Sequence, residues 1–282
     1  MKTSSENWKY AVSLGIPAAL LFFSIFILAN HYISTGDWFE RSIELKGGML
    51  ITINTPTPPD IKRIETVLGE EGNVLIRELR SLSGHTILIE TEHNKNATQI
   101  IERIKTIGID VSDFSIETIG PSLGESFWRQ AQISISIAFI FMGLIVFFIF
   151  RTFVPSFAVM LAAVSDIIGT LAFMQIFGIP MSLASFAAIL MLIGYSIDTD
   201  ILLTTRVLKE EMKIDDRVKS AFKTGITMTG TTLAALIAVI TLSSSRILIQ
   251  IASVLIIGLI IDLINTWLQN ATIIKLYVKR RS

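Results

Sequence analysis

The sequence contains no cysteine, only three histidines and few charged residues. Without cysteine, the chain has no disulfide, no thiolate nucleophile and no cysteine-ligated metal site. Charged residues make up 17% of the chain, whereas soluble domains usually carry about a quarter. The 24 basic and 24 acidic residues balance, so no net charge attracts nucleic acid. Disulfide scaffolds, zinc modules and cysteine enzymes are therefore excluded, and nucleic acid is not expected as a partner.

Long apolar runs, in contrast, are abundant. Hydrophobic residues make up 51% of the 282 residues, and the mean hydropathy is +0.62. A helix needs about 20 apolar residues to cross the roughly 30 Å of hydrocarbon in a bilayer. Six stretches meet this requirement: 10–29, 132–150, 153–177, 182–208, 226–242 and 247–276. The sequence therefore predicts an α-helical polytopic protein of the cell membrane with six transmembrane helices.

The distribution of basic residues predicts the orientation. Most lysines and arginines near the helix ends fall in 2–9, 206–223 and 275–281, whereas the opposite short loops hold only Arg246. Because basic residues favour the cytoplasmic side, both termini are expected there. Residues 1–30 would then form the N-terminus and helix 1, which lacks a signal-peptide cleavage site. Residues 129–282 would form helices 2–6, with a cytoplasmic loop at 206–223.

Residues 31–128 have the composition of a separate soluble domain. They include 15 acidic and 9 basic residues, a net charge of −6. Alternating apolar residues predict strands at 49–54, 74–82, 86–90 and 114–118, and helical periodicity predicts helices at 61–68 and 100–107. The order β-α-β-β-α-β favours an α+β ferredoxin-like fold. We expect this extracytoplasmic domain between helices 1 and 2.

Four carboxylates interrupt the apolar stretches. They are Asp166, Asp198, Asp200 and Asp262, and no lysine or arginine lies at a comparable depth. A carboxylate at the bilayer centre costs on the order of 3 kcal/mol, so it normally faces protein or a water-filled cavity. These four residues are the candidates for ion or proton coupling.

Two of the carboxylates cannot share one helix face. Asp198 and Asp200 are two residues apart, which is about 200° around a helix axis. The sequence around Asp198 favours a functional role for that residue. Two interpretations are open for Asp200. It has a functional role, or it forms an ion pair with Arg206 or contacts a lipid headgroup.

The sixth span carries a polar stripe. Asp262, Asn265 and Gln269 recur at spacings of three and four, which places them on one side of a helix. Asn270 follows directly. We expect this stripe to face a neighbouring span or an aqueous cavity.

Five short motifs occur in a fixed order along the chain. They are Glu44-Leu45-Lys46-Gly47-Gly48, Ile119-Gly120-Pro121-Ser122-Leu123-Gly124, Ser165-Asp166, Gly194-Tyr195-Ser196-Ile197-Asp198-Thr199-Asp200 and Thr266-Trp267-Leu268-Gln269-Asn270. Together they resemble the SecD/SecF family of protein-export membrane proteins, and most closely its archaeal SecF branch. The resemblance covers essentially the whole chain. In the first motif, the glycine pair permits a tight turn or a close backbone contact before the first strand.

The resemblance implies a member of the resistance-nodulation-division superfamily that pairs with SecD in the lipid bilayer. Such a subunit assists a SecY-type channel and a translocating polypeptide, using the proton gradient through carboxylates of the fourth span. It is not an enzyme and needs no cofactor or metal. The sequence accordingly has no Gly-x-x-x-x-Gly-Lys phosphate loop.

This sequence departs from the family pattern in the fourth span. Bacterial members typically read Gly-Tyr-Ser-x-Asn-Asp, whereas here Asp198 stands in place of the asparagine and Thr199 in place of the aspartate. The resemblance therefore does not assign the proton relay to one aspartate. A basic residue of the family near the start of the fifth span corresponds to Lys223, within one residue.

Two other functions remain open at this stage. One is an independent small-molecule or lipid exporter of the same superfamily, which homodimerisation would complete. The other is an intramembrane aspartyl protease, in which Asp166 and either Asp198 or Asp262 would share a proton. The usual Gly-x-Gly-Asp motif of such proteases is missing before Asp198.

Overall fold

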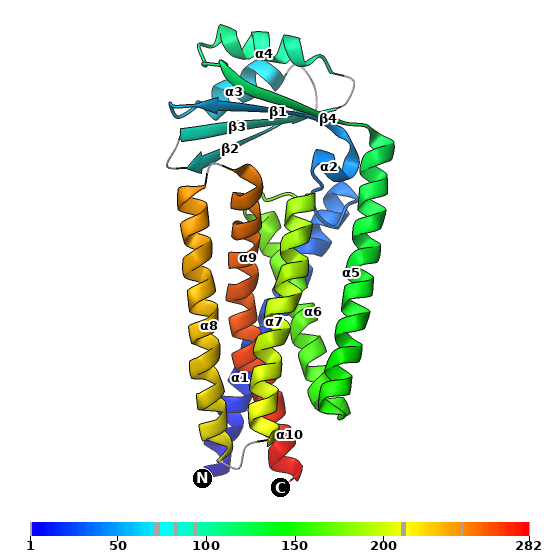
Figure 1. Ribbon diagram of the computed structural model, residues 1–282, viewed down its shortest axis with the longest axis vertical. Coiled ribbons are helices and arrows are strands. Elements are labelled where there is room, and N and C mark those ends of the chain that lie inside the picture. Colours follow the sequence, from blue (N-terminus) through cyan, green and yellow to red (C-terminus); the bar gives the residue numbers. More distant parts are fainter. Residues whose placement is uncertain are drawn as a thin grey trace.

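A computed structural model describes residues 2–69, 74–81, 84–92, 95–209, 213–243 and 245–281. Long helices run side by side, and a small α+β layer covers one end of them (Figure 1). Both termini lie at the other end of the helices. The described chain therefore consists of a helical bundle and a sheet domain.

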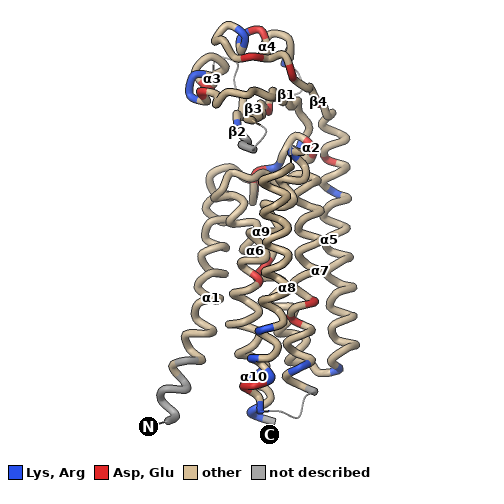
Figure 2. The backbone as a smooth tube through the Cα atoms, turned by 60° about the vertical axis from the view of Figure 1, so that its left-hand side comes forward, with Lys and Arg blue, Asp and Glu red and all other residues tan. Residues whose placement is uncertain are grey.

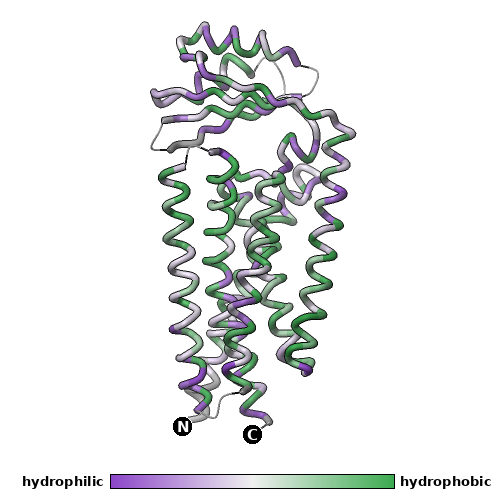
Figure 3. Tube along the Cα trace, viewed as in Figure 1, coloured by the Kyte–Doolittle hydropathy of each residue, from purple (hydrophilic) through white to green (hydrophobic). Residues whose placement is uncertain are grey.

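Six helical stretches are long and apolar enough to cross a membrane, which confirms the predicted number. Figure 3 shows hydrophobic residues along most of their length. The helices of the bundle are α1 (Lys2–Thr35), α5 (Pro121–Phe150), α6 (Phe153–Ile176), α7 (Leu183–Lys209), α8 (Ile214–Leu242), and α9 (Arg246–Ile264) continued by the π-helix η2 (Asn265–Asn270) and α10 (Ala271–Arg281).

Three of these helices begin well before the apolar runs predicted. Helix α1 begins at Lys2 rather than at 10, α5 at Pro121 rather than at 132, and α8 at Ile214 rather than at 226. The extra turns contain polar residues that are compatible with a helix outside the hydrocarbon. Apolar composition therefore marks the membrane-crossing part, and the helices continue beyond it.

The sheet domain contains the predicted order of strands and helices. The elements are β1 (Gly48–Thr55), α3 (Ile61–Leu68), β2 (Leu75–Ser81), β3 (Gly84–Thr91), α4 (Ala97–Thr106) and β4 (Asp113–Ile119). The strands lie in the order β2-β3-β1-β4, and each adjacent pair is antiparallel. Residue 82, the end of the second predicted strand, lies outside the described residues.

The two faces of the sheet have different neighbours. Helices α3 and α4 cover the outer face (Figure 1), where Ile51, Ile89 and Ile104 belong to a fully buried apolar core. On the face toward the bundle, Leu50 and Leu88 pack against Ile43 of the short helix α2 (Ile43–Lys46). The sheet thus has its own core and only a small apolar contact with α2.

The glycines of two distant motifs meet where the sheet joins the bundle. Gly47 has a φ of +80° and packs against Pro121 and Gly124 in the first turn of α5. A Cβ on Gly124 would lie 2.5 Å from the backbone nitrogen of Gly47, and one on Gly47 would lie 2.6 Å from the Cα of Pro121. The predicted close backbone contact at Gly47 is confirmed.

We expect Gly124→Ala to destabilise the protein by about 2 kcal/mol, because its methyl group would collide with backbone that cannot move alone. Gly15→Ala is the matched control, since nothing lies within 4 Å of a Cβ at that helical position. Thermal unfolding of the purified variants in mild detergent measures the difference. Equal unfolding temperatures for the two variants would contradict the tight α2–α5 contact.

Candidate functional site

Three of the four predicted carboxylates come together inside the bundle. Asp166 of α6 is 1% exposed, and Asp200 of α7 and Asp262 of α9 are fully buried. Figure 2 shows acidic positions part-way along the helices, between the two ends of the bundle. These three helices pack on one another there, so the carboxylates are held in an interior that excludes most solvent.

Asp166 is held by side chains from two neighbouring helices. Its Oδ2 accepts a hydrogen bond from the Ser196 hydroxyl at 2.6 Å, and its Oδ1 accepts one from the Asn265 amide at 2.7 Å. Both oxygens therefore have a donor. The contacts tie α6 to α7 through Ser196 and to η2 through Asn265.

Asp200 and Asp262 share one hydroxyl. The Thr266 Oγ1 lies 2.9 Å from Oδ1 of Asp200 and 3.1 Å from Oδ1 of Asp262, and the Asn270 amide donates to the same Asp200 oxygen at 2.6 Å. A threonine hydroxyl has a single proton to donate. With both carboxylates ionised, one of the two contacts would lack a proton, so the geometry favours a proton on one of the pair.

Several acceptors in this cluster remain unsatisfied. Among the described residues, no hydrogen-bond partner reaches Oδ2 of Asp200, Oδ2 of Asp262, or Oδ1 of Asn265 and of Asn270. A buried acceptor without a partner costs about 1–3 kcal/mol. Each of these oxygens is therefore open to a further donor, either a protonated carboxyl group or a water molecule.

A π-helical turn supplies most of the donors. Asn265, Thr266, Gln269 and Asn270 are all buried within η2, which confirms that the predicted polar stripe faces inward. Such turns are frequent at functional sites. The sequence analysis assigned no individual role to Thr266 and did not predict the π-helix. The signal was present as a run of polar residues inside an apolar span.

The two aspartates of α7 lie on opposite sides of the helix, as predicted. Asp200 is buried, whereas Asp198 is exposed on the surface of the chain. The functional role predicted for Asp198 therefore stays a prediction. The pairing of Asp200 with Arg206 is not found: Asp200 accepts hydrogen bonds from Thr266 and Asn270, and Arg206 donates to the Ser220 hydroxyl at 2.8 Å.

The other residues of the fourth-span motif divide in the same way. Ser196 and Thr199 are buried on the side of Asp200, and Gly194 and Tyr195 are exposed with Asp198. Lys223 is exposed on α8 and is not among the side chains that contact the three carboxylates. Within the described ranges, no group of three histidines or acidic residues is arranged to hold a metal ion.

We expect Thr266→Val to lower the free energy of unfolding by about 1–3 kcal/mol, because it leaves two buried carboxyl oxygens without their shared donor. Thr231→Val is the control, since the Thr231 hydroxyl is exposed and bonds only to the Met228 carbonyl of its own helix, at 2.8 Å. Thermal unfolding in detergent tests both. If the two variants unfold at the same temperature, the shared hydroxyl does not stabilise the cluster.

Fold and site define a class of membrane protein: six spanning helices, a sheet domain inserted between the first two, and buried carboxylates where α6, α7 and α9 meet. A family model described as protein export membrane protein SecD/SecF, C-terminal, matches residues 99–280. That match covers more than half of the chain. The chain belongs to the SecD/SecF family.

Relatives in archaea match along nearly their whole length. The chain is 40% identical to the protein-export membrane protein SecF of Methanolacinia petrolearia over 272 residues, covering 95% of this chain and 93% of that protein. It is also 40% identical to the SecF of Methanocaldococcus jannaschii over 279 residues, covering 95% and 96%. Within the family, the chain is therefore similar to the SecF members.

Solved structures support the same architecture. The crystal structure of SecDF from Thermus thermophilus, described as a translocon-associated membrane protein, matches with a TM-score of 0.76 and 19% identity. The match covers 96% of this chain but only 38% of that longer chain. At this identity the likeness supports the fold, and most of the larger protein has no counterpart here.

Proposed function

We propose that this chain is an accessory subunit of the Sec protein-export machinery and acts with a SecD partner. The observation that carries the proposal is the match to archaeal SecF proteins over at least nine-tenths of both chains. The partner would supply the part of SecDF that this chain lacks. Together they would assist a SecY-type channel and a translocating polypeptide.

The orientation forms part of the proposal. The basic segments and both termini belong to the end of the bundle opposite the sheet, and the positive-inside tendency assigns that end to the cytoplasm. The sheet domain is then extracytoplasmic, where an emerging polypeptide arrives. Its strand order β2-β3-β1-β4 is consistent with the ferredoxin-like class.

The carboxylate cluster is the candidate for proton coupling. One hydroxyl lies between Asp200 and Asp262, so protonation changes which oxygen it can donate to. That choice affects contacts between α7 and the turn η2, and a shift between two helix arrangements would follow. We propose that entry and loss of a proton here move the helices, and through them the outer domain.

We expect Asp200→Asn to reduce export to the level of a strain lacking the protein, while assembly with SecD is retained, because the amide cannot exchange the proton. Asp216→Asn, at an exposed position in the first turn of α8, is the matched control. The measurement is the export rate of a secreted reporter in the native host. Unimpaired export by Asp200→Asn would exclude coupling through this residue.

One face of α7 is the candidate contact with SecD. Asp198 lies on it, and an exposed carboxylate within a spanning helix costs on the order of 3 kcal/mol in lipid. A protein partner with a hydrogen-bond donor would remove that cost. The exposed residues follow one stripe along the helix: Leu183, Ala187, Met191, Gly194, Tyr195 and Asp198.

We expect Met191→Trp to weaken capture of SecD several-fold, because a larger side chain on this stripe would separate the helices. Leu144→Trp on α5 is the control, since both leucine and methionine are exposed in the isolated chain. The measurement is the amount of SecD recovered with the tagged protein in a pulldown in mild detergent after crosslinking. Recovery of a homodimer alone from the unmodified protein would instead favour an independent exporter.

A further inference from the structure

The sheet domain is attached covalently at one corner. Strand β1 leaves α2 at Gly48, and β4 leads through Gly120 into α5. Gly48 and Ile119 are paired in the sheet register, so the two connections lie side by side. Strands β1 and β4 occupy one side of the sheet, and β2 is the opposite edge.

Helix α2 is anchored to the bundle through the side chain of Glu44. The carboxylate of Glu44 accepts a hydrogen bond from the backbone nitrogen of Leu183 at 2.8 Å and lies 3.4 Å from the Arg246 guanidinium. Between this anchored helix and the sheet stand Gly47 and Gly48, both with positive φ. Gly47 packs against α5 and Gly48 is paired with Ile119, so this corner of the sheet stays attached to the bundle and is the point about which the β2 edge can move.

At the opposite edge, one arginine joins the sheet to the bundle. Arg77 of β2 contacts the Glu90 carboxylate at 2.9 Å and the Glu40 carboxylate at 2.8 Å. Glu90 lies on β3 and is part of the same sheet. Glu40 precedes α2, and its backbone carbonyl accepts a hydrogen bond at 2.8 Å from Met181, in the connection between α6 and α7. Of these two contacts of Arg77, the one with Glu40 therefore crosses from the sheet to the bundle.

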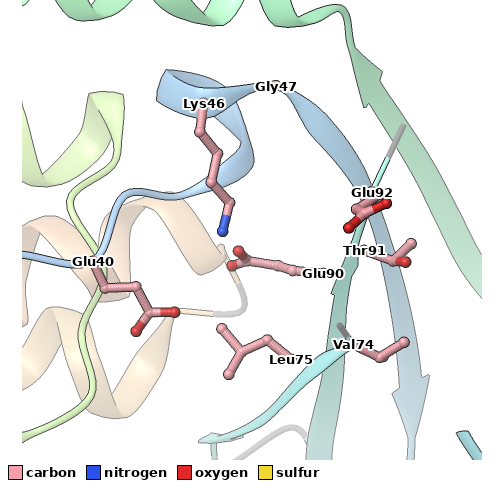
Figure 4. Close-up of a pocket in the computed structure, with 8 residues that line it drawn as sticks. All are labelled: Glu40, Lys46, Gly47, Val74, Leu75, Glu90, Thr91 and Glu92. Carbon is pink, nitrogen blue, oxygen red and sulfur yellow. The ribbon is translucent and has the colours of Figure 1, made fainter. Parts of the chain in front are cut away.

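The space around this contact is not filled. A cavity of about 450 Å³ separates the sheet residues Ile76 and Leu88 from Ile179 and Ile249 of the bundle. In an adjacent cavity of about 460 Å³, the side chains of Glu40, Lys46 and Glu90 converge (Figure 4). Apolar packing therefore holds the sheet near α2, and at the β2 edge an ion pair bridges a partly empty gap.

Glu90 keeps Arg77 in place within the sheet. Its side chain is 9% exposed, and burial raises its pKa even though Arg77 and Lys46 attract its charge. Its Oε2 has no hydrogen-bond partner among the described residues. Removing Glu90 would change a contact inside the sheet, whereas removing Glu40 would change the contact across the gap.

We infer that the Arg77–Glu40 pair is a releasable latch, and that the sheet domain swings on Gly47–Gly48 when the pair opens. The inference concerns how the outer domain is held and does not depend on the proposed export role. If that role is correct, the latch sets how readily movement of the helices reaches the outer domain.

The test compares Glu40→Gln with Glu90→Gln, which remove one carboxylate each from the same arginine. The chain has no cysteine of its own, so two introduced cysteines can be spin-labelled selectively. Labels on Glu65→Cys in α3 and Leu242→Cys in α8, both exposed positions, report one distance between the sheet domain and the bundle. We expect Glu40→Gln to raise the population at longer distances about two- to fivefold, a range typical of partly exposed ion pairs. Glu90→Gln should raise that population less than Glu40→Gln does, because it leaves the direct Arg77–Glu40 contact in place.

A third variant, Arg77→Gln, tests whether Glu40 acts through Arg77. If the pair is the latch, Arg77→Gln combined with Glu40→Gln should open the domain no further than Glu40→Gln alone. An unchanged distance distribution in Glu40→Gln would overturn the inference, as would equal opening in Glu90→Gln. Because the distance is measured without export, its result is independent of the Asp200→Asn export test, and either proposal can fail while the other stands.

Discussion

The bundle depends on placing three carboxyl groups where lipid and protein exclude water. A carboxylate at that depth is tolerated only if neighbouring side chains donate to it. The donors here are the side chains of Ser196, Asn265, Thr266 and Asn270. Each donates to a carboxyl oxygen of another helix, and Thr266 also contacts Asp262 of its own continuous helix. These hydrogen bonds link α6, α7 and the π-helical turn after α9, and the apolar side chains of the same helices pack around them.

Not every buried oxygen of the carboxylate cluster has a hydrogen-bond donor among the described residues. Buried oxygens without donors sit beside a hydroxyl shared by two carboxyls. An interior built only for stability would satisfy these groups or replace them with apolar residues. In the proposed proton coupling, these open acceptors are the positions that a proton would reach. The same helices connect to the outer domain through a glycine pivot and an ionic contact, rather than through a continuous apolar core.

Much of the architecture could be predicted from local sequence patterns. Six apolar runs indicated the spans, and alternation indicated each strand of the sheet domain, because these patterns report which faces of an element are buried. The ends of α5 and α8 could not be predicted in this way, since a helix does not end where the bilayer does. Which of Asp198 and Asp200 is buried could not be predicted either. Spacing showed that they face different sides, but it contained no information about which side the neighbouring helices cover.

The sequence by itself determined that the chain is a membrane protein, that a separate domain interrupts its helices, and that carboxylates lie in its spans. Composition and periodicity are sufficient for those conclusions because they reflect the solvent that each segment must meet. Only the tertiary structure decided which aspartates form one cluster, that Thr266 joins two of them, and that Arg77 reaches Glu40. Apart from the contact between Thr266 and Asp262, these contacts join residues 30 to 99 positions apart. Several of them also involve a π-helical turn, whose register no α-helical repeat anticipates. Their geometry depends on how whole elements pack, and packing is a property of the folded chain.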